Sequence, residues 1–212
     1  MSVSKIFHSL QNELKGSKPG IKAQLKMSTH PRPGHTLYQK VQSSSVQAGV
    51  LLVLYPKKKG FYLVLTRRTR GMYHHQSQIS FPGGRREKGE SFEQAALRET
   101  KEELGIPPEY LRIVGRLTPL YIPPSNHCIH PVVSVTEKSP PFRPSPDEVS
   151  EVIEIPVNHL LDEKNVYREV WNVDGNELKV PFYLYKGNKI WGATAMVLAE
   201  MLEIWKRIKS KK

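Results

Sequence analysis

The sequence is poor in cysteine and lacks long apolar runs. Cys128 is the only cysteine, so the chain cannot form an internal disulfide. No stretch approaches the roughly 18 consecutive apolar residues that a membrane-spanning helix needs, and the first residues carry no apolar signal segment. The last three residues do not form a peroxisomal Ser-Lys-Leu address. We therefore expect a cytoplasmic protein.

Acidic residues are outnumbered: 20 Asp and Glu stand against 32 Lys and Arg, which gives a formal net charge of +12. Such an excess attracts polyanions over long distances. Nucleic acid, an anionic membrane surface and phosphorylated small molecules all fit, so composition leaves this choice open. Hydrophobic residues make up 38% of the 212 residues, which suits one globular domain with a sizeable core.

The N-terminal part differs from the rest of the chain. The spacing of its apolar residues predicts a short amphipathic helix over residues 4–15. Repeated glycine and proline then predict a loop-rich connection over residues 16–34. We therefore expect residues 1–44 to form an extension that packs on a domain of residues 45–212.

Apolar and β-branched stretches predict several strands in this larger domain. Residues 46–55 and 61–66 predict a hairpin around a turn at 57–60. Further strands are predicted over residues 79–81, 111–119, 130–136, 150–155, 168–173 and 178–185, and a final helix over residues 192–208. Strands with few helices between them predict an α/β or α+β sandwich around a mixed sheet.

The clearest helix covers residues 92–104. Ser91 is a favourable N-cap, and Gln94 three residues later completes a capping box. Gly105 provides a C-cap, and the prolines at 107 and 108 prevent the helix from continuing.

This helix carries three glutamates on one face. Glu99 comes three residues before Glu102 and four before Glu103, and residues at these separations are neighbours on a helix. The like charges repel, and a cation between them would remove the repulsion. An all-oxygen ligand set suits Mg²⁺ or Mn²⁺. Arg98 can pair with one of the carboxylates, and the alternative is simply a solvated, charged helix.

A longer pattern surrounds these residues. It runs Gly84, five residues, Glu90, seven residues, Arg98-Glu99, two residues, Glu102-Glu103, one residue, Gly105 and then Ile106. This pattern resembles the signature of the Nudix hydrolase family. Seven fixed positions at about 7% each, over roughly 200 starting points, make a chance match about one in a million. Thr100 stands where the family often has an aliphatic residue, which affects packing more than chemistry.

The resemblance implies a Nudix fold, an α/β/α sandwich, and attack by a metal-activated water on one phosphorus of a diphosphate. It implies four metal ligands: Glu99, Glu102, Glu103 and the carbonyl of Gly84. It gives catalytic roles to these glutamates and to Arg98, with Glu90 supporting Arg98. The general base stays open between Glu103 and three acids of a later loop, Asp147, Glu148 and Glu151.

The stretch before this pattern resembles the coenzyme A diphosphatase branch of the family. It reads Leu63-Val64-Leu65-Thr66-Arg67-Arg68-Thr69 and then Gln78-Ile79-Ser80-Phe81-Pro82-Gly83-Gly84. Arg68 matches the first arginine of the branch motif, whereas Thr69, Tyr73 and Ser77 depart from it. Members of this branch cleave coenzyme A to adenosine 3′,5′-bisphosphate and 4′-phosphopantetheine. The resemblance extends over roughly residues 5–206.

Arginines before the pattern are the predicted substrate ligands. Arg67, Arg68 and Arg70 offer planar donors for phosphate. We expect coenzyme A or acyl-CoA as the substrate and no nucleic-acid or membrane partner, and we leave a homodimer open. One alternative substrate class is ADP-ribose, a dinucleotide or a noncanonical nucleoside triphosphate. The other alternative is a non-catalytic Nudix-fold protein that binds nucleotide or nucleic acid.

Overall fold

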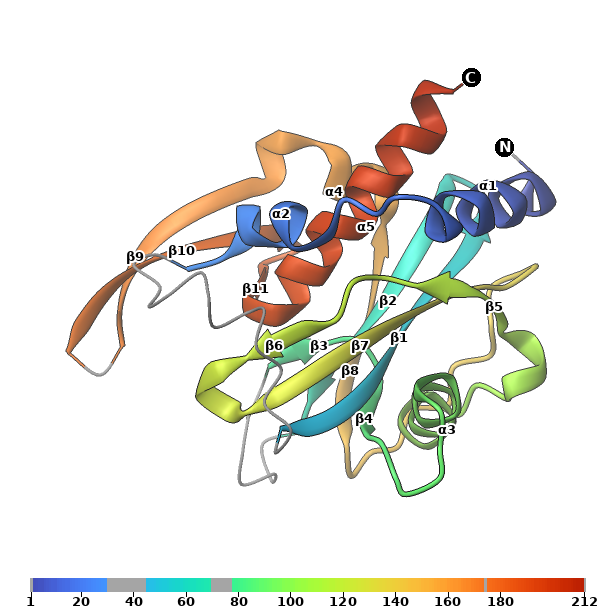
Figure 1. Cartoon of the computed structure of the whole chain (residues 1–212), viewed down its shortest axis with the longest axis horizontal. Helices are drawn as coiled ribbons and strands as arrows, with labels where there is room; N and C mark the ends of the chain where they lie inside the picture. The colour runs from blue at the N-terminus through green and yellow to red at the C-terminus, as the bar shows by residue number, and fades with distance from the viewer. Residues whose placement is uncertain (1, 30–44, 70–77, 174, 212) are drawn as a thin grey trace.

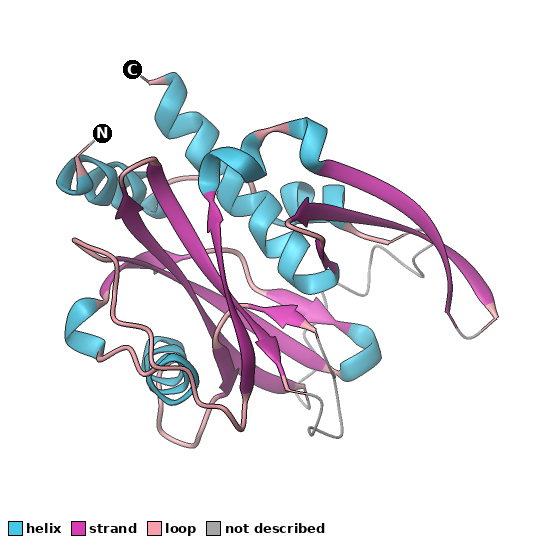
Figure 2. Ribbon diagram, turned by 180° about the vertical axis from the view of Figure 1, so that it is seen from behind, coloured by secondary structure: helices cyan, strands magenta, loops and turns pink. Residues whose placement is uncertain are grey.

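A computed structural model of the chain describes residues 2–29, 45–69, 78–173 and 175–211. Figures 1 and 2 show it from opposite sides. Its helices are α1 (Val3–Lys15), α2 (Gly20–Gln24), α3 (Phe92–Leu104), α4 (Val157–Leu161) and α5 (Gly192–Ser210), with 3-10 turns at Leu25–Met27, Pro108–Tyr110, Pro123–Ser125 and Glu163–Asn165. Its strands are β1 (Val46–Lys57), β2 (Gly60–Arg68), β3 (Ile79–Ser80), β4 (Gly83–Arg85), β5 (Arg112–Arg116), β6 (Leu120–Ile122), β7 (His127–Val135), β8 (Val149–Pro156), β9 (Val166–Val173), β10 (Asn176–Tyr185) and β11 (Asn188–Trp191).

The larger sheet is mixed. Its main path runs β3-β2-β1-β7-β5, with β4 paired to β1, β6 to β7 and β8 to β2. The β1–β7 pair is parallel, while β1–β2 and β2–β8 are antiparallel. The long strand β1 therefore lies near the middle of the sheet, and its apolar residues are covered on both sides.

Helices cover both faces of this sheet, which confirms the predicted α/β/α sandwich. Side chains of a strand point alternately to opposite faces. On β1, Leu51 and Val53 belong to the cluster that contains Ala96 of α3, whereas Leu52 and Leu54 belong to the cluster that contains the buried residues of α5. Figure 1 shows α3 on one side of the sheet and α1 and α5 on the other.

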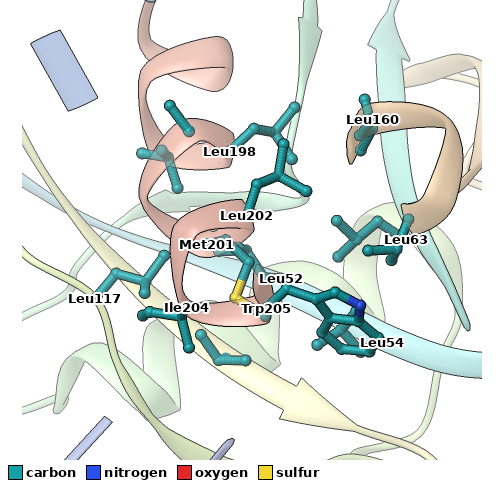
Figure 3. Packing of buried hydrophobic residues seen from close by; sticks show 14 of the residues in the cluster. Leu52, Leu54, Leu63, Leu117, Leu160, Leu198, Met201, Leu202, Ile204 and Trp205 are labelled. Atoms are coloured by element: carbon teal, nitrogen blue, oxygen red, sulfur yellow. The ribbon is translucent and has the colours of Figure 1, made fainter. Parts of the chain in front are cut away.

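The larger part of the core lies beneath α5. Figure 3 shows Leu198, Leu202 and Trp205 of this helix packed toward Leu54 and Leu63 of the sheet. Complete burial of such side chains contributes about 1.5–3 kcal/mol each relative to exposure. The buried face of α1 adds Ile6, Leu10 and Leu14 to the same cluster, so the helix predicted over residues 4–15 is confirmed.

The connection after α1 contains more regular structure than the sequence predicted. Instead of continuous loop over residues 16–34, α2 spans Gly20–Gln24 and a 3-10 turn follows. The Gln24 side chain is fully buried and donates to Glu200 of α5 at 2.7 Å, so a distant contact fixes this short helix. Residues 30–44 lie outside the described ranges, and the division between residues 44 and 45 stays a prediction.

A second, three-stranded sheet follows the order β11-β10-β9 and is antiparallel. The β9–β10 hairpin extends away from the larger sheet, as Figure 1 shows. The strands predicted over residues 168–173 and 178–185 are confirmed within this sheet, whereas β11 was not predicted. The strand predicted over residues 111–119 is shorter, because β5 ends at Arg116. Within the described ranges, no helix is long and apolar enough to cross a membrane.

Candidate active site

The two ends of α3 are fixed by local hydrogen bonds. The Ser91 hydroxyl accepts from the Gln94 N–H at 3.1 Å, and the Gln94 side chain accepts from the Ser91 N–H at 2.7 Å. Gly105 ends the helix in the left-handed region, at φ 64°. Ala96 and Leu104 pack into the core under the sheet. The glutamates on the remaining helix surface therefore have a fixed orientation relative to the sheet.

Arg98 bonds to three carboxylates at once. Its Nε and Nη2 donate to the two oxygens of Glu90 at 2.8 and 3.2 Å. Its Nη1 donates to Glu99 Oε1 at 2.8 Å and to Glu102 Oε2 at 3.1 Å. A guanidinium serves all of these because it carries five N–H donors in a rigid fork. Glu99 and Glu102 therefore already converge on one cationic nitrogen.

Glu90 holds Arg98 from outside the helix. Its Oε2 also accepts from the Glu87 N–H at 2.9 Å, which ties the carboxylate to the turn before α3. The hydrogen bonds from Arg98 and from the Glu87 backbone lower the pKa of Glu90. The predicted contact between Glu90 and Arg98 is therefore present.

Glu99 lies against β4. An ideal Cβ built on Gly84 would be 2.5 Å from the Glu99 Oε1, so only glycine leaves room for the carboxylate there. Burial raises the pKa of Glu99, and the charges of Glu102 and Glu148 act in the same direction, while Arg98 opposes them. The site thus brings the backbone of Gly84 and one predicted carboxylate into direct proximity.

Glu103 is the most buried of the three glutamates, with 3% of its surface exposed. The Thr66 hydroxyl donates to its Oε2 at 3.5 Å. Burial raises the pKa of Glu103 to about 8. Arg68 and the backbone of Gly83 oppose this rise, whereas the charges of Glu99 and Glu148 add to it. A buried carboxyl with this pKa needs a positive partner before it ionises easily at neutral pH.

The later loop contributes one acid to this cluster. Glu148 is half-buried, and its charge acts on both Glu99 and Glu103. Glu151 is instead paired with Arg67, Nε to Oε2 at 2.9 Å. The contact found for Asp147 is made by its backbone carbonyl, which accepts from the Thr69 hydroxyl at 2.8 Å. Of the three acids considered as a base, Glu148 is the one whose charge acts on the helix glutamates.

The predicted substrate arginines do not share one environment. Arg68 lies close enough to Glu103 for its charge to lower the pKa of that carboxyl. Arg67, the preceding residue of β2, contacts Glu151 and donates from Nη2 to Asn188 Oδ1 at 2.5 Å. Arg70 lies outside the described residues, as do Tyr73 and Ser77 of the branch motif.

The donor set suits a hard divalent cation. Among the described residues, no three acidic, histidine or cysteine side chains are already arranged around a common metal position. Mg²⁺ does not require such a cage, because it commonly binds one or two protein carboxylates and completes its shell with water and substrate phosphate. Glu99 and Glu102 both accept a hydrogen bond from Arg98 Nη1. Both carboxylates can therefore reach a single positive charge.

Comparison with known proteins places this chain in a family. The model of the NUDIX domain matches residues 45–171. A protein from Photorhabdus laumondii named uncharacterized Nudix hydrolase NudL is 30% identical over 78% of this chain and 88% of its own length. A protein of the same name from Salmonella paratyphi B is 35% identical over 66% of this chain and 72% of its own length.

One solved structure supports the fold. The Nudix hydrolase RenU of M. smegmatis matches with a TM-score of 0.51 and 18% identity, over 77% of this chain and 88% of that one. Together with the matching domain and the relatives, the fold and the glutamate helix give one answer: this chain is a hydrolase of the Nudix family.

Proposed function

We propose that this enzyme hydrolyses the diphosphate linkage of coenzyme A or an acyl-CoA to adenosine 3′,5′-bisphosphate and 4′-phosphopantetheine. The proposed cofactor is Mg²⁺ or Mn²⁺. Its ligands are the carboxylates of Glu99, Glu102 and Glu103 and the carbonyl of Gly84. Arg68 binds the phosphates of the substrate, and the family assignment supports hydrolysis as the reaction class.

One observation carries the proposal: Glu99 and Glu102 converge on the same nitrogen of Arg98. Two carboxylates held this way favour a cation between them. In the metal-free protein the guanidinium supplies that charge. The Nε and Nη2 of Arg98 donate to Glu90. Arg98 can therefore stay beside the site when Glu99 and Glu102 bind a metal instead.

Each residue has a physical task in the proposed reaction. A bound divalent cation neutralises charge on the phosphate oxygens and strengthens water as a nucleophile. Glu99 lies against Gly84 and is the metal ligand closest to β4. The exposed Glu102 is the ligand on the solvent side of the metal. Arg68 places a positive charge near Glu103, where the phosphate oxygens become more negative as the linkage breaks.

The proton acceptor is drawn from two carboxylates. Glu103 is one, because its burial favours the protonated form once it has received a proton. Glu148 is the other, because its charge acts on both Glu99 and Glu103 while its side chain lies on a separate loop. Glu148→Gln should lower kcat by about 100-fold if Glu148 is the base, in line with general-base catalysis. Asp147→Asn is the matched control.

Support for coenzyme A comes from the motif that precedes the glutamate helix. Its strand portion is β2, and Arg68, the motif arginine, is the last residue of that strand and acts through its charge on Glu103. A diphosphate that carries a further phosphate also suits a chain with a net charge of +12.

The decisive experiment is product analysis by mass after incubation of the full chain with coenzyme A and Mg²⁺. We expect the two products named above, with no turnover in EDTA. Glu102→Gln should reduce turnover by orders of magnitude with little change in Tm, because the Glu102 side chain is 51% exposed. Lys101→Met, on the same helix, is a control that leaves the carboxylates intact.

Other outcomes lead to defined corrections. Turnover of ADP-ribose or a dinucleotide with coenzyme A untouched would disprove the substrate assignment and leave the metal site standing. Wild-type turnover in both Glu102→Gln and Glu103→Gln would overturn the metal site. No hydrolysis of any of these substrates, combined with salt-dependent binding of random nucleic acid, would favour a binding protein.

A further inference from the structure

A cleft of about 410 Å³ opens at the end of β2, the strand whose last residue is the proposed phosphate ligand Arg68. Its walls include Arg67, Gln78, Asn188, Lys189 and Trp191. They come from the end of β2, the start of β3 and the strand β11 of the smaller sheet. Arg67 directly precedes Arg68 in β2, and the pairing of β2 with β8 shifts register between these two residues, so the cleft and the arginine assigned to the diphosphate lie at the same end of this strand. Its volume lies within the range of small-molecule sites, about 300–1,000 Å³.

Several contacts fix the walls of this cleft. The Arg67 Nη2 donates to Asn188 Oδ1 at 2.5 Å and so joins the two sheets. The Thr194 hydroxyl, in the first turn of α5, donates to the Ile79 carbonyl at 2.9 Å. The Arg68 N–H donates to the Gln78 carbonyl at 3.1 Å. A site with walls held in this way loses little entropy when a ligand enters.

Trp191 gives the cleft an aromatic surface. It is 38% exposed, which is unusual for a large hydrophobic side chain in the described part of this protein. The ring of Trp171 packs against it edge to face, with centroids 5.0 Å apart and an angle of 74° between the planes. This contact sets the orientation of the Trp191 indole. A fixed, partly exposed indole is a stacking platform for a planar base.

Lys189 supplies a positive charge two residues away. Its Nζ lies 2.6 Å from Glu169 Oε2 and 5.1 Å from the centroid of the Phe182 ring. An ammonium has three N–H donors, and the pair with Glu169 needs only one of them. Exposed pairs of this kind contribute little stability, so sharing Lys189 with a phosphate costs little.

From these observations we propose that the cleft is the subsite for the adenosine 3′,5′-bisphosphate end of the substrate. The adenine stacks on Trp191, and the 3′-phosphate accepts hydrogen bonds from Lys189. The inference rests on the proposed function, since it assumes a nucleotide whose diphosphate lies at Arg68. The pantetheine end has neither an aromatic ring nor a second phosphate, so it matches neither of these two groups.

The test measures binding by calorimetry in EDTA, so that it does not depend on turnover. The ligands are adenosine 3′,5′-bisphosphate, AMP and 4′-phosphopantetheine. Trp191→Leu should weaken binding of both nucleotides about tenfold, within the range known for base stacking on aromatic side chains. Trp191→Phe should restore most of the affinity. This recovery in Trp191→Phe would show that the affinity lost in Trp191→Leu comes from loss of the aromatic ring and not from a general folding defect.

Lys189→Met should weaken adenosine 3′,5′-bisphosphate about fivefold and leave AMP unchanged, because AMP lacks the 3′-phosphate. In the same variant, the preference of kcat/KM for coenzyme A over dephospho-coenzyme A should shrink by a similar factor. Lys179→Met is the matched control, since Lys179 is exposed on β10 and does not line the cleft. Tyr167→Leu, an exposed aromatic of β9 outside the cleft, is the control for Trp191.

The inference fails if wild-type protein does not bind adenosine 3′,5′-bisphosphate at millimolar ligand, or if Trp191→Leu weakens only 4′-phosphopantetheine. It also fails if the control variants lose as much affinity as the cleft variants. These failures differ from failure of the proposed function. Nucleotide binding that depends on Trp191 without hydrolysis of coenzyme A would keep the subsite and reject the reaction. Hydrolysis with unchanged binding in Trp191→Leu would do the reverse.

Discussion

The carboxylate of Glu99 occupies the space that any side chain at position 84 would need. A Cβ on Gly84 would come within 2.5 Å of both Cδ and Oε1 of Glu99. A Cβ atom makes no favourable non-bonded contact at so short a separation. The neighbouring glycine differs, because a Cβ on Gly83 would meet backbone, the Gly49 carbonyl oxygen at 2.4 Å. The two adjacent glycines are therefore required for different reasons. Gly84 leaves room for the Glu99 carboxylate, and Gly83 allows the close backbone approach of β4 to β1.

This difference predicts separate outcomes for two alanine substitutions. Gly84→Ala should fold, because the end of the Glu99 side chain can rotate away, but hydrolysis should fall at least tenfold and the Mg²⁺ concentration for half-maximal activity should rise. Gly83→Ala should lower Tm markedly, since its φ of 149° and its backbone neighbours leave no room to adjust. Thermal unfolding and metal titrations of the two purified variants provide the comparison. Equal loss of Tm in both would contradict it.

The geometry of Arg98 predicts that lysine cannot replace it. Its three nitrogens bond to Glu90, Glu99 and Glu102 in directions set by the planar fork. Lysine has one nitrogen at the end of a flexible chain, so it can serve one or two of these partners. We expect Arg98→Lys to reduce kcat by about tenfold or more and to lower Tm by a few degrees. Kinetics on Arg98→Lys beside Lys101→Met would test this, and equal activity in the two would disprove the role of the fork.

The local part of the candidate site could be predicted from sequence. Helix α3 begins and ends at the predicted residues, because the cap residues Ser91, Gln94 and Gly105 act on their immediate neighbours. The shared face of Glu99 and Glu102 follows from helical spacing alone. For the same reason the buried strand β1 was predicted, since a continuous run of apolar residues is a local feature of the sequence.

Contacts between distant segments could not be read in this way. Thr66 and Glu148 reach the Glu103 region only because β2 and the loop before β8 converge on α3. From the sequence, Glu148 was one of three loop acids that could serve as the general base, and nothing local distinguished it from the other two. The short helix α2 was predicted as loop for the same reason, because Gln24 is held by Glu200, 176 positions later. β11 was missed since four residues give too weak a pattern.

Glu200 of α5 holds the N-terminal helix α2 to the rest of the chain, and this contact leads to a prediction for stability. This fully buried carboxylate accepts from Gln24 Nε2 at 2.7 Å, from the Gly20 N–H at 3.1 Å and from the Thr118 hydroxyl at 2.7 Å. Glu200→Ala should lower the free energy of unfolding by about 3 kcal/mol, which is a fall of roughly 10 °C in Tm. Glu203→Ala, which removes the surface pairs with Lys26 and Lys206, should cost less than about 1 kcal/mol. Similar losses in both variants would exclude a special role for Glu200.

The buried carboxyl of Glu103 predicts a pH-dependent effect on stability in the metal-free protein. Its pKa is about 8 in the fold, against an ordinary value of 4.5. Between these values the folded state keeps a proton that the unfolded state has released, so the stability of the wild type falls as pH rises through this window. Glu103→Gln has no such proton.

In EDTA, Glu103→Gln should therefore match the wild type below about pH 4.5 and become progressively more stable above it, by one to a few kcal/mol, levelling off above about pH 8. Denaturant unfolding at several pH values measures this difference. The same substitution should abolish most hydrolysis, and Mg²⁺ should raise the Tm of the wild type more than that of the variant, since binding to the folded state stabilises it. A stability difference that does not change with pH would mean that Glu103 is ionised in the metal-free fold. Its burial would then be offset by Arg68 more strongly than the geometry indicates.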